Sequence, residues 1–232
     1  MTLSTLVLNS TIKGLTRLLC RVDDGQLSRV PNQGPLIIVS NHINFLEVPL
    51  LYTHLQPRQI TGFAKAETWD NPAMGFLFDR WQAIPLRRGE VDINAMRLAL
   101  NALREGKILA VAPEGTRSGH GHLGRGHPGV VMIALQSGAP LLPIVYYGNE
   151  HFKRNLSHLQ RTDFRINVGN PFLLDSRGVK VSRQVRRQMT DEIMYQLATL
   201  LPPANRGYYS DLNCARFTYL RFLTGTPCNT CQ

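Results

Sequence analysis

The chain has 232 residues, of which 43% are hydrophobic, and it has no low-complexity stretch, so a fibrous or intrinsically disordered protein is excluded. This length suits one domain with one core. Because 26 Lys and Arg stand against 16 Asp and Glu, the formal net charge is +10, which favours anionic partners such as anionic lipid, nucleic acid or phosphorylated substrates without choosing among them.

The first predicted element is an amphipathic helix over residues 3–19. Its apolar positions recur at helical spacing, at Leu8, Ile12, Leu15 and Leu19. Polar side chains occupy other faces, at Asn9, Lys13, Thr16 and Arg17. Such a helix either packs on the domain or lies in a membrane interface, and the sequence leaves both interpretations open.

No apolar run approaches the length of a membrane-spanning helix, which needs about eighteen or more residues. The first basic residue, Lys13, comes too late for the basic start of a signal peptide. Cys228 and Cys231 form a terminal CNTC segment, but a structural zinc needs four ligands in suitable spacing. We therefore expect neither a spanning helix nor a metal site.

Short apolar runs and helical patterns alternate through the middle of the chain. Strands are predicted over residues 35–40, 59–64, 107–112, 140–146 and 164–169, with a weaker one over 83–86. Helices are predicted from Asp92 to Gly106 and from Pro128 to Gly138. This order predicts an α/β fold with a central, mostly parallel β-sheet flanked by helices and preceded by the N-terminal amphipathic helix. Ligand sites of such sheets lie beyond the carboxyl ends of the strands.

After Pro171 the pattern becomes one long helix over residues 182–201, which the sequence LPP ends. The last part of the chain, RGYYSDLNCARFTYLRFL, mixes arginines with aromatic residues. Such a segment either lies at a membrane interface or packs against the domain. No internal repeat or second domain is evident.

Asn41, His42 and Glu47 follow directly on the strand LIIVS. On a regular helix the spacing of His42 and Glu47 gives about 140° beyond one turn, so the side chains meet only if His42 lies in a loop and Glu47 begins the next helix. The carboxylate then fixes one imidazole nitrogen, and the other can take a proton from a hydroxyl. Taken alone, such a pair is more often an ordinary polar loop edge than a catalytic site.

A second polar stretch, APEGTRS, follows the strand KILAVA. Gly115 lets backbone amides approach an anion, and Arg117 supplies a guanidinium fork that matches phosphate oxygens. By itself the stretch is also typical of a surface turn with a salt bridge. Two weaker signals are AIPLRRG, with Arg87 and Arg88, and LLPIVYYG, a strand that contains Pro143.

Together and in this order, the four stretches resemble the glycerolipid acyltransferase family, which contains the 1-acylglycerol-3-phosphate acyltransferases. That family has an Asn-His-x-x-x-x-Asp box, an arginine block, a Glu-Gly-Thr-Arg box and a late proline strand. The resemblance covers roughly residues 34–148. It implies an acyltransferase domain over residues 25–203, between the helical segment 1–24 and a basic, aromatic tail over 204–232.

The resemblance implies a catalytic pair, with His42 as general base and Glu47 as the carboxylate that orients it. It assigns substrate phosphate binding to Lys65, Arg88, Glu114, Gly115, Thr116 and Arg117. Three departures are visible. Glu47 stands where aspartate is usual, Pro85 stands where an aromatic residue is usual, and GRGHPG replaces a common lysine-containing segment. The last two lie near the expected acceptor site and leave the acceptor open.

The implied function is transfer of a fatty acyl group from acyl-CoA or acyl carrier protein to the hydroxyl of a lysophospholipid, with 1-acyl-sn-glycerol-3-phosphate as the first choice of acceptor and no cofactor. Glycerol 3-phosphate or a lyso-aminolipid are alternative acceptors. A nucleic-acid-binding module fits the net charge but leaves both boxes unexplained, so we expect no nucleic acid. Lipid substrates imply an anionic membrane surface as partner, and a peripheral or monotopic protein on the cytoplasmic face of a membrane.

Overall fold

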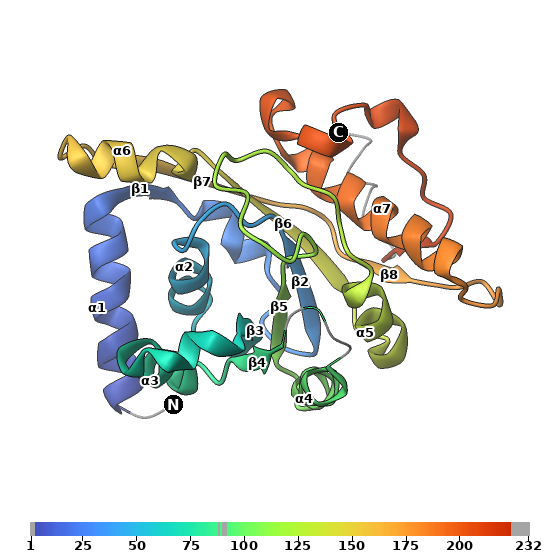
Figure 1. Ribbon diagram of the computed structural model, residues 1–232, viewed down its shortest axis with the longest axis horizontal. Helices are drawn as coiled ribbons and strands as arrows, with labels where there is room; N and C mark the ends of the chain where they lie inside the picture. Colours follow the sequence, from blue (N-terminus) through green and yellow to red (C-terminus); the bar gives the residue numbers. More distant parts are fainter. Residues whose placement is uncertain (1–2, 88, 90–91, 224–232) are drawn as a thin grey trace.

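The computed structural model describes residues 3–87, 89 and 92–223. Within them a mostly parallel sheet is flanked by helices on both faces (Figure 1). The helices are α1 (Leu3–Leu19), α2 (Glu47–His54), α3 (Pro72–Arg80), α4 (Ile93–Arg104), α5 (Gly129–Ser137), α6 (Phe152–Ser157) and α7 (Arg183–Leu200). The strands are β1 (Cys20–Asp23), β2 (Leu36–Ser40), β3 (Ile60–Lys65), β4 (Ile84–Leu86), β5 (Ile108–Val111), β6 (Leu141–Tyr147), β7 (Thr162–Val168), β8 (Phe172–Leu174) and β9 (Leu220–Phe222). The predicted α/β fold is confirmed.

The strand order, β1-β7-β6-β2-β5-β3-β4, puts β2 at the centre of the sheet. β2 pairs in parallel with both β5 and β6, and Val39 lies opposite Val111 and Pro143. The antiparallel pairs are β6 with β7, β6 with β8, and β8 with β9. Because neighbouring parallel strands end at the same edge, the segments that follow β2 and β5 must meet there.

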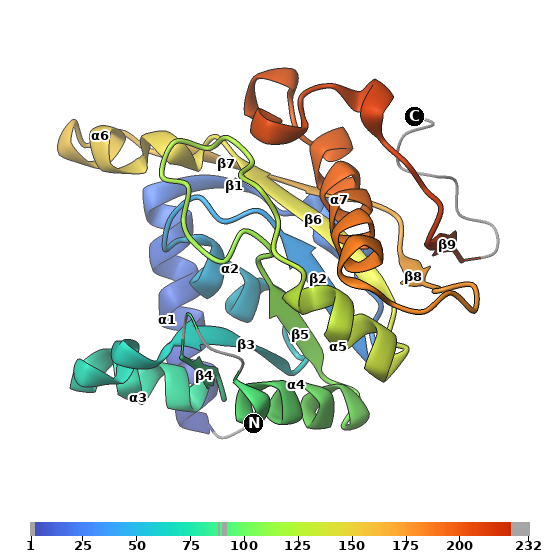
Figure 2. The same cartoon turned by 45° about the vertical axis from the view of Figure 1, so that its right-hand side comes forward.

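The core forms two layers, one on each face of the sheet. Ile37 and Val39 of β2 pack with α4, α5 and α7, whereas Leu36 and Ile38 pack with α2 and with Trp81 after α3. This alternation follows from the period of two along a strand, which sends successive side chains to opposite faces. Figure 2 shows α4, α5 and α7 on one side of the sheet and α1 and α2 on the other.

The N-terminal helix α1 turns a largely polar side toward the domain. Thr5, Asn9 and Thr16 are buried, and Asn9 Oδ1 accepts a hydrogen bond from Trp81 Nε1 at 3.0 Å. Four apolar side chains of the helix stay exposed: Leu6, Val7, Leu15 and Leu18. The helix therefore packs on the domain and still presents an apolar side to solvent. Among the described residues, no helix is both long and apolar enough to cross a bilayer.

The described part of the segment that follows α7, up to residue 223, packs against the domain. Tyr209 is only 1% exposed, and its hydroxyl donates to Asp191 at 2.8 Å. Tyr219 and Leu220 are also buried, and β9 extends the sheet beside β8. The CNTC segment with Cys228 and Cys231 lies outside the described residues. Of the two interpretations of this segment, packing against the domain accounts for its described part.

Candidate active site

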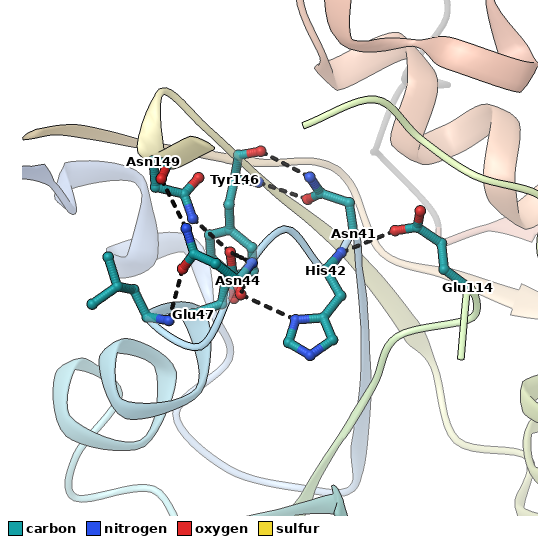
Figure 3. Close-up of polar contacts among 8 residues, drawn as sticks. Asn41, His42, Asn44, Glu47, Glu114, Tyr146 and Asn149 are labelled. Carbon is teal, nitrogen blue, oxygen red and sulfur yellow. Dashed lines mark hydrogen bonds and ion pairs between the residues drawn. The ribbon is translucent and has the colours of Figure 1, made fainter. Parts of the chain in front are cut away.

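The turn after β2 brings His42 and Glu47 together. His42 lies in the loop, Glu47 is the first residue of α2, and the imidazole Nδ1 and the carboxylate Oε2 are 3.0 Å apart. The five-residue spacing of His42 and Glu47 required a strand, a turn and a helix start in this order, and the structure has them. Figure 3 shows the ring of His42 turned toward the carboxylate of Glu47. The Glu47 side chain is 5% exposed and that of His42 is 18% exposed, so the carboxylate is enclosed while part of the ring remains accessible.

Two asparagines hold the Glu47 carboxylate. The backbone N–H of Asn44 donates to its Oε1 at 3.0 Å, and the side-chain amide of Asn149 donates to the same oxygen at 2.5 Å. The amide of Asn44 in turn donates to the backbone carbonyl of Asn149 at 2.8 Å. Sequence reasoning missed both residues. Asn44 lies inside the first box, whereas nothing in the sequence marks Asn149, which reaches the site from the segment after β6.

Asn41 anchors the start of the loop to β6. Its side-chain amide donates to the backbone carbonyl of Tyr146 and its Oδ1 accepts from the Tyr146 N–H, both at 2.8 Å. The side chain therefore continues the backbone pairing of β2 with β6 by one more step. Burial, with a smaller contribution from Glu47, raises the pKa of the Tyr146 phenol.

Glu114, in the turn that follows β5, connects the second box to the first. Its Oε1 accepts from the backbone N–H of His42 at 2.9 Å, and its Oε2 accepts from the N–H of Gly124 at 2.7 Å. The residue is 5% exposed, and burial raises the pKa of its carboxyl. Further along, Ser118 N–H donates to the His42 carbonyl at 2.8 Å. Both carboxylate oxygens of Glu114 therefore accept hydrogen bonds from the backbone, and the side chain fixes the loop that carries His42.

Gly115, Thr116 and Arg117 form an exposed turn beside this frame. Gly115 has φ +69°, a conformation that residues with a Cβ rarely adopt, and a Cβ there would lie 3.4 Å from the ring of His127. Arg117 is exposed and does not line the cavity described below.

The other two cationic residues implied by the resemblance lie elsewhere along the sheet edge. Lys65 is the last residue of β3 and lines the cavity; its ammonium is 3.2 Å from Glu67, and its side chain is 50% exposed. Arg88 lies outside the described residues. Lys65 and His42 therefore line the same cavity.

A large cavity of about 1060 Å³ opens beside His42. Its wall near His42 is polar, and most of the rest is apolar. Apolar lining side chains come from α2, β3, α4 and α5 and include Leu51, Phe63, Met96, Leu100 and Ile133. An elongated apolar group therefore fits next to a histidine.

The arrangement supports proton transfer from a group in the cavity. When Nδ1–H of a neutral imidazole donates to Glu47, the lone pair of Nε2 is available, and Nε2 has no hydrogen-bond partner among the residues that the structure describes (Figure 3). The carboxylate stabilises the imidazolium that forms when Nε2 takes a proton.

Comparisons with known proteins identify the family of the chain. Residues 21–147 match the family model described as Acyltransferase. The chloroplastic 1-acyl-sn-glycerol-3-phosphate acyltransferase BAT2 of Brassica napus is 28% identical over 157 residues, which cover 65% of this chain and 45% of that protein. The lyso-ornithine lipid O-acyltransferase of Pseudomonas aeruginosa is 31% identical over 111 residues, which cover 47% of this chain and 42% of that protein. The chain thus spans about half the length of these two relatives.

A solved structure extends the likeness to the fold. The crystal structure of the 1-acyl-sn-glycerophosphate (LPA) acyltransferase PlsC from Thermotoga maritima has a TM-score of 0.61 and 24% identity, and the match covers 82% of this chain and 76% of that one. The match reaches beyond residues 21–147 and shows that the fold is shared over most of the chain.

Proposed function

Because this chain belongs to the acyltransferase family, we propose that it transfers a fatty acyl group from acyl-CoA or acyl carrier protein to the free hydroxyl of a lysophospholipid. The favoured acceptor is 1-acyl-sn-glycerol-3-phosphate, which is the substrate named for the Brassica relative. The observation that carries the proposal is the 3.0 Å contact of His42 with Glu47 at the wall of a largely apolar cavity.

In the proposed reaction, His42 Nε2 takes the proton of the acceptor hydroxyl as its oxygen attacks the thioester carbonyl. The tetrahedral intermediate then collapses, the carbon–sulfur bond breaks, and the departing thiolate takes the proton from the imidazolium. An ester and a free thiol result, and the imidazole is regenerated. Glu47 acts through His42 by fixing its tautomer and stabilising its charged form.

The cavity supports a lipid substrate because its apolar wall extends from α2 across β3 to α4 and α5. A saturated chain gains about 0.8 kcal/mol for each methylene that it buries, so a cavity of this kind binds acyl chains without specific polar contacts. The apolar region lies next to the histidine, which puts the reactive end of the chain at the polar wall.

The acceptor's phosphate is assigned to the cations at the polar end of the site. Lys65 lines the cavity, and Gly115, Thr116 and Arg117 form the exposed turn beside His42. Arg88 remains a candidate outside the described residues. We assign Glu114 a positioning role, because a buried carboxylate that accepts two backbone N–H bonds has no donor to offer a phosphate.

A purified-protein assay against a panel of acceptors tests the proposal. The panel contains 1-acyl-sn-glycerol-3-phosphate, glycerol 3-phosphate and a lyso-ornithine lipid, each offered with acyl-CoA and with acyl carrier protein. We expect the highest kcat/KM with 1-acyl-sn-glycerol-3-phosphate. Similarity to the Pseudomonas lyso-ornithine lipid enzyme favours that lipid as the second candidate. Lack of transfer to every acceptor from both donors contradicts the proposal.

We further propose that α1 holds the protein on an anionic membrane surface. Leu6, Val7, Leu15 and Leu18 are exposed although the helix packs on the domain. Neighbouring elements add exposed apolar side chains, with Met74 and Phe76 on α3 and Leu156 on α6. Arg80, the last residue of α3, bonds Ser4 at 2.7 Å, and Arg161 after α6 bonds the carbonyl of Arg17 at 2.6 Å, so α3 and α6 adjoin the two ends of α1 (Figure 1).

A pair of charge-matched variants tests the membrane role. Leu15→Asp with Leu18→Asp should weaken sedimentation with anionic liposomes about tenfold or more, since two exposed apolar groups are lost and two negative charges are added. Asn94→Asp with Asn101→Asp, at exposed polar positions of α4 on the other face of the sheet, adds the same charge away from α1 and should weaken it far less. Equal weakening by both pairs would show that charge alone governs binding, and undiminished binding of the leucine variant would remove α1 from the interface.

A further inference from the structure

A second cavity, of about 440 Å³, has four arginines among its seven lining residues. It lies between the loop before α5 and the first turn of α7. Its wall consists of residues 125–128 together with Arg183, Arg186 and Arg187. None of these described lining residues is acidic, so the cavity offers guanidinium groups without a carboxylate to neutralise them from within.

The four arginines differ in how far they are already engaged. Arg187 is held by Asp191 at 2.8 Å and donates to the carbonyl of Gly126 at 2.9 Å, so it supports the wall. Arg125 lies over the ring of Tyr208, 5.7 Å from its centroid. Arg183 and Arg186 make no ion pair or side-chain hydrogen bond with the part of the chain that the structure describes. Two guanidinium groups are thus available to an anion.

This arginine cavity adjoins the candidate active site. His127, Pro128 and Arg186 line both cavities, and the His127 ring packs beside Gly115. Ser40, Asn41, His42 and Glu47 line only the larger cavity. An anion held by Arg183 is therefore separated from the reacting imidazole by the turn that contains Gly115 and by His127.

We propose that the arginine cavity binds the phosphate on the pantetheine arm of the acyl donor, a group common to acyl-CoA and acyl carrier protein. This inference rests on the proposed function. Pairs of arginines bind phosphate through bidentate, charge-assisted hydrogen bonds. The acyl chain then occupies the apolar cavity, the thioester lies at His42, and the arm passes Gly115 and His127 to reach Arg183 and Arg186.

The same separation disfavours the phosphate of the acceptor. In a lysophosphatidic acid the phosphate is carried by the carbon next to the one that bears the reacting hydroxyl, so it must bind close to His42. The arm of the donor, in contrast, puts a long chain between its phosphate and its thioester. A phosphate at the end of this long arm can therefore bind in the arginine cavity, which adjoins the candidate active site but is not lined by His42.

Two small donors that differ by this one phosphate provide the test: acyl-4′-phosphopantetheine and acyl-pantetheine. For the wild type we expect kcat/KM to be about ten- to a hundredfold higher with the phosphorylated donor. Arg183→Gln with Arg186→Gln should bring the two donors within about twofold of each other, while the KM of the acceptor changes little. Arg154→Gln with Arg165→Gln, at exposed positions on α6 and β7, removes the same charge elsewhere and should keep the preference.

Two results of this donor comparison would overturn the proposal. If the Arg183 and Arg186 variant keeps the donor preference, the cavity does not hold this phosphate. If the variant keeps the donor preference and the KM of the acceptor also rises, the arginines bind the acceptor, and the proposal is overturned. A single Arg183→Gln variant, at the exposed start of α7, replaces the pair if circular dichroism shows that the double variant does not fold.

Direct binding keeps the test independent of turnover. Calorimetric titration with CoA should show binding by the wild type and by the Arg154 and Arg165 variant, weakened about tenfold or more in the Arg183 and Arg186 variant. Equal affinity in all three proteins overturns the cavity assignment. The wild type could bind CoA, with binding weakened only in the Arg183 and Arg186 variant, and still transfer no acyl group. That result would support the phosphate site and contradict the proposed acyl transfer. Comparing acyl-CoA with acyl carrier protein identifies the carrier.

Discussion

His42 and Arg117 stand on neighbouring turns at the same edge of the sheet, but the structure holds them in opposite ways. The loop that carries His42 is fixed by buried or partly buried hydrogen bonds that involve the side chains of Asn41, Glu47 and Glu114. The turn that carries Arg117 is exposed. A base must meet a hydroxyl in one geometry, whereas a phosphate site supplies charge to a ligand that brings its own oxygens. The contrast gives each turn a distinct expected response to mutation.

The largest effect is expected at His42. His42→Ala should lower kcat about a thousandfold or more, because the variant lacks the imidazole that takes the hydroxyl proton. The free energy of unfolding should change little, since the ring is partly exposed and, within the described part of the chain, bonds only Glu47. Steady-state acyl transfer and thermal unfolding measure the two quantities. His122→Ala, at an exposed position, serves as the control, and substantial turnover by His42→Ala would eliminate the mechanism.

Glu47 should show the next largest effect. Glu47→Gln should lower kcat about a hundredfold, because an amide N–H that donates to Nδ1 forces the proton onto Nε2. Glu47→Asp keeps the charge and should be milder, provided that the shorter side chain still reaches His42. The ratio of the two kcat values is the measurement. Equal losses in both variants would mean that Glu47 serves packing rather than orientation.

Glu114→Gln tests the connection between the turns. The amide retains one oxygen, so it cannot accept from both His42 N–H and Gly124 N–H. One buried donor loses its partner, which costs about 1–3 kcal/mol of unfolding free energy. We expect denaturant unfolding to show that loss, with a fall in kcat smaller than that of Glu47→Gln. Unchanged stability would contradict the positioning role.

The smallest effect is expected on the exposed turn. Arg117→Gln should raise the KM of the acceptor about tenfold and leave the free energy of unfolding within about 0.5 kcal/mol, since exposed arginines contribute little to stability. Arg154→Gln provides an exposed control on α6. A fall in kcat without a change in the KM of the acceptor would argue against phosphate binding and would weaken the contrast between the turns.

Much of the fold was predictable because its central strands are strongly apolar and its long helices carry clear signals. The six strands and four helices predicted between residues 3 and 201 are all present, as β2 to β7 and as α1, α4, α5 and α7. The strands β1, β8 and β9 were missed: each has three or four residues, and, unlike the equally short β4 and β5, β1 and β9 do not fall in an uninterrupted apolar run. α3 was also missed, although Asn71 and Pro72 form a recognisable helix start.

The site was predictable only where its residues stand close together along the chain. His42 and Glu47 fall in one short stretch, and the geometry of strand, turn and helix start follows from their spacing. Asn149 touches Glu47 from a distant segment, and its contact arises from the position of β6 beside β2, which no local pattern encodes. The burial of Glu114 depends likewise on where the loop after β5 meets His42.

The central claim is that Glu47 holds the proton of His42 on Nδ1, so that Nε2 is the basic atom. Nitrogen NMR of protein with ¹⁵N-labelled histidine tests this most directly, with the His42 signals assigned by their absence from His42→Ala. In the neutral ring we expect a protonated Nδ1 and an unprotonated Nε2. A neutral ring protonated at Nε2 would contradict the account, because that atom would then have no lone pair to receive the proton of the acceptor.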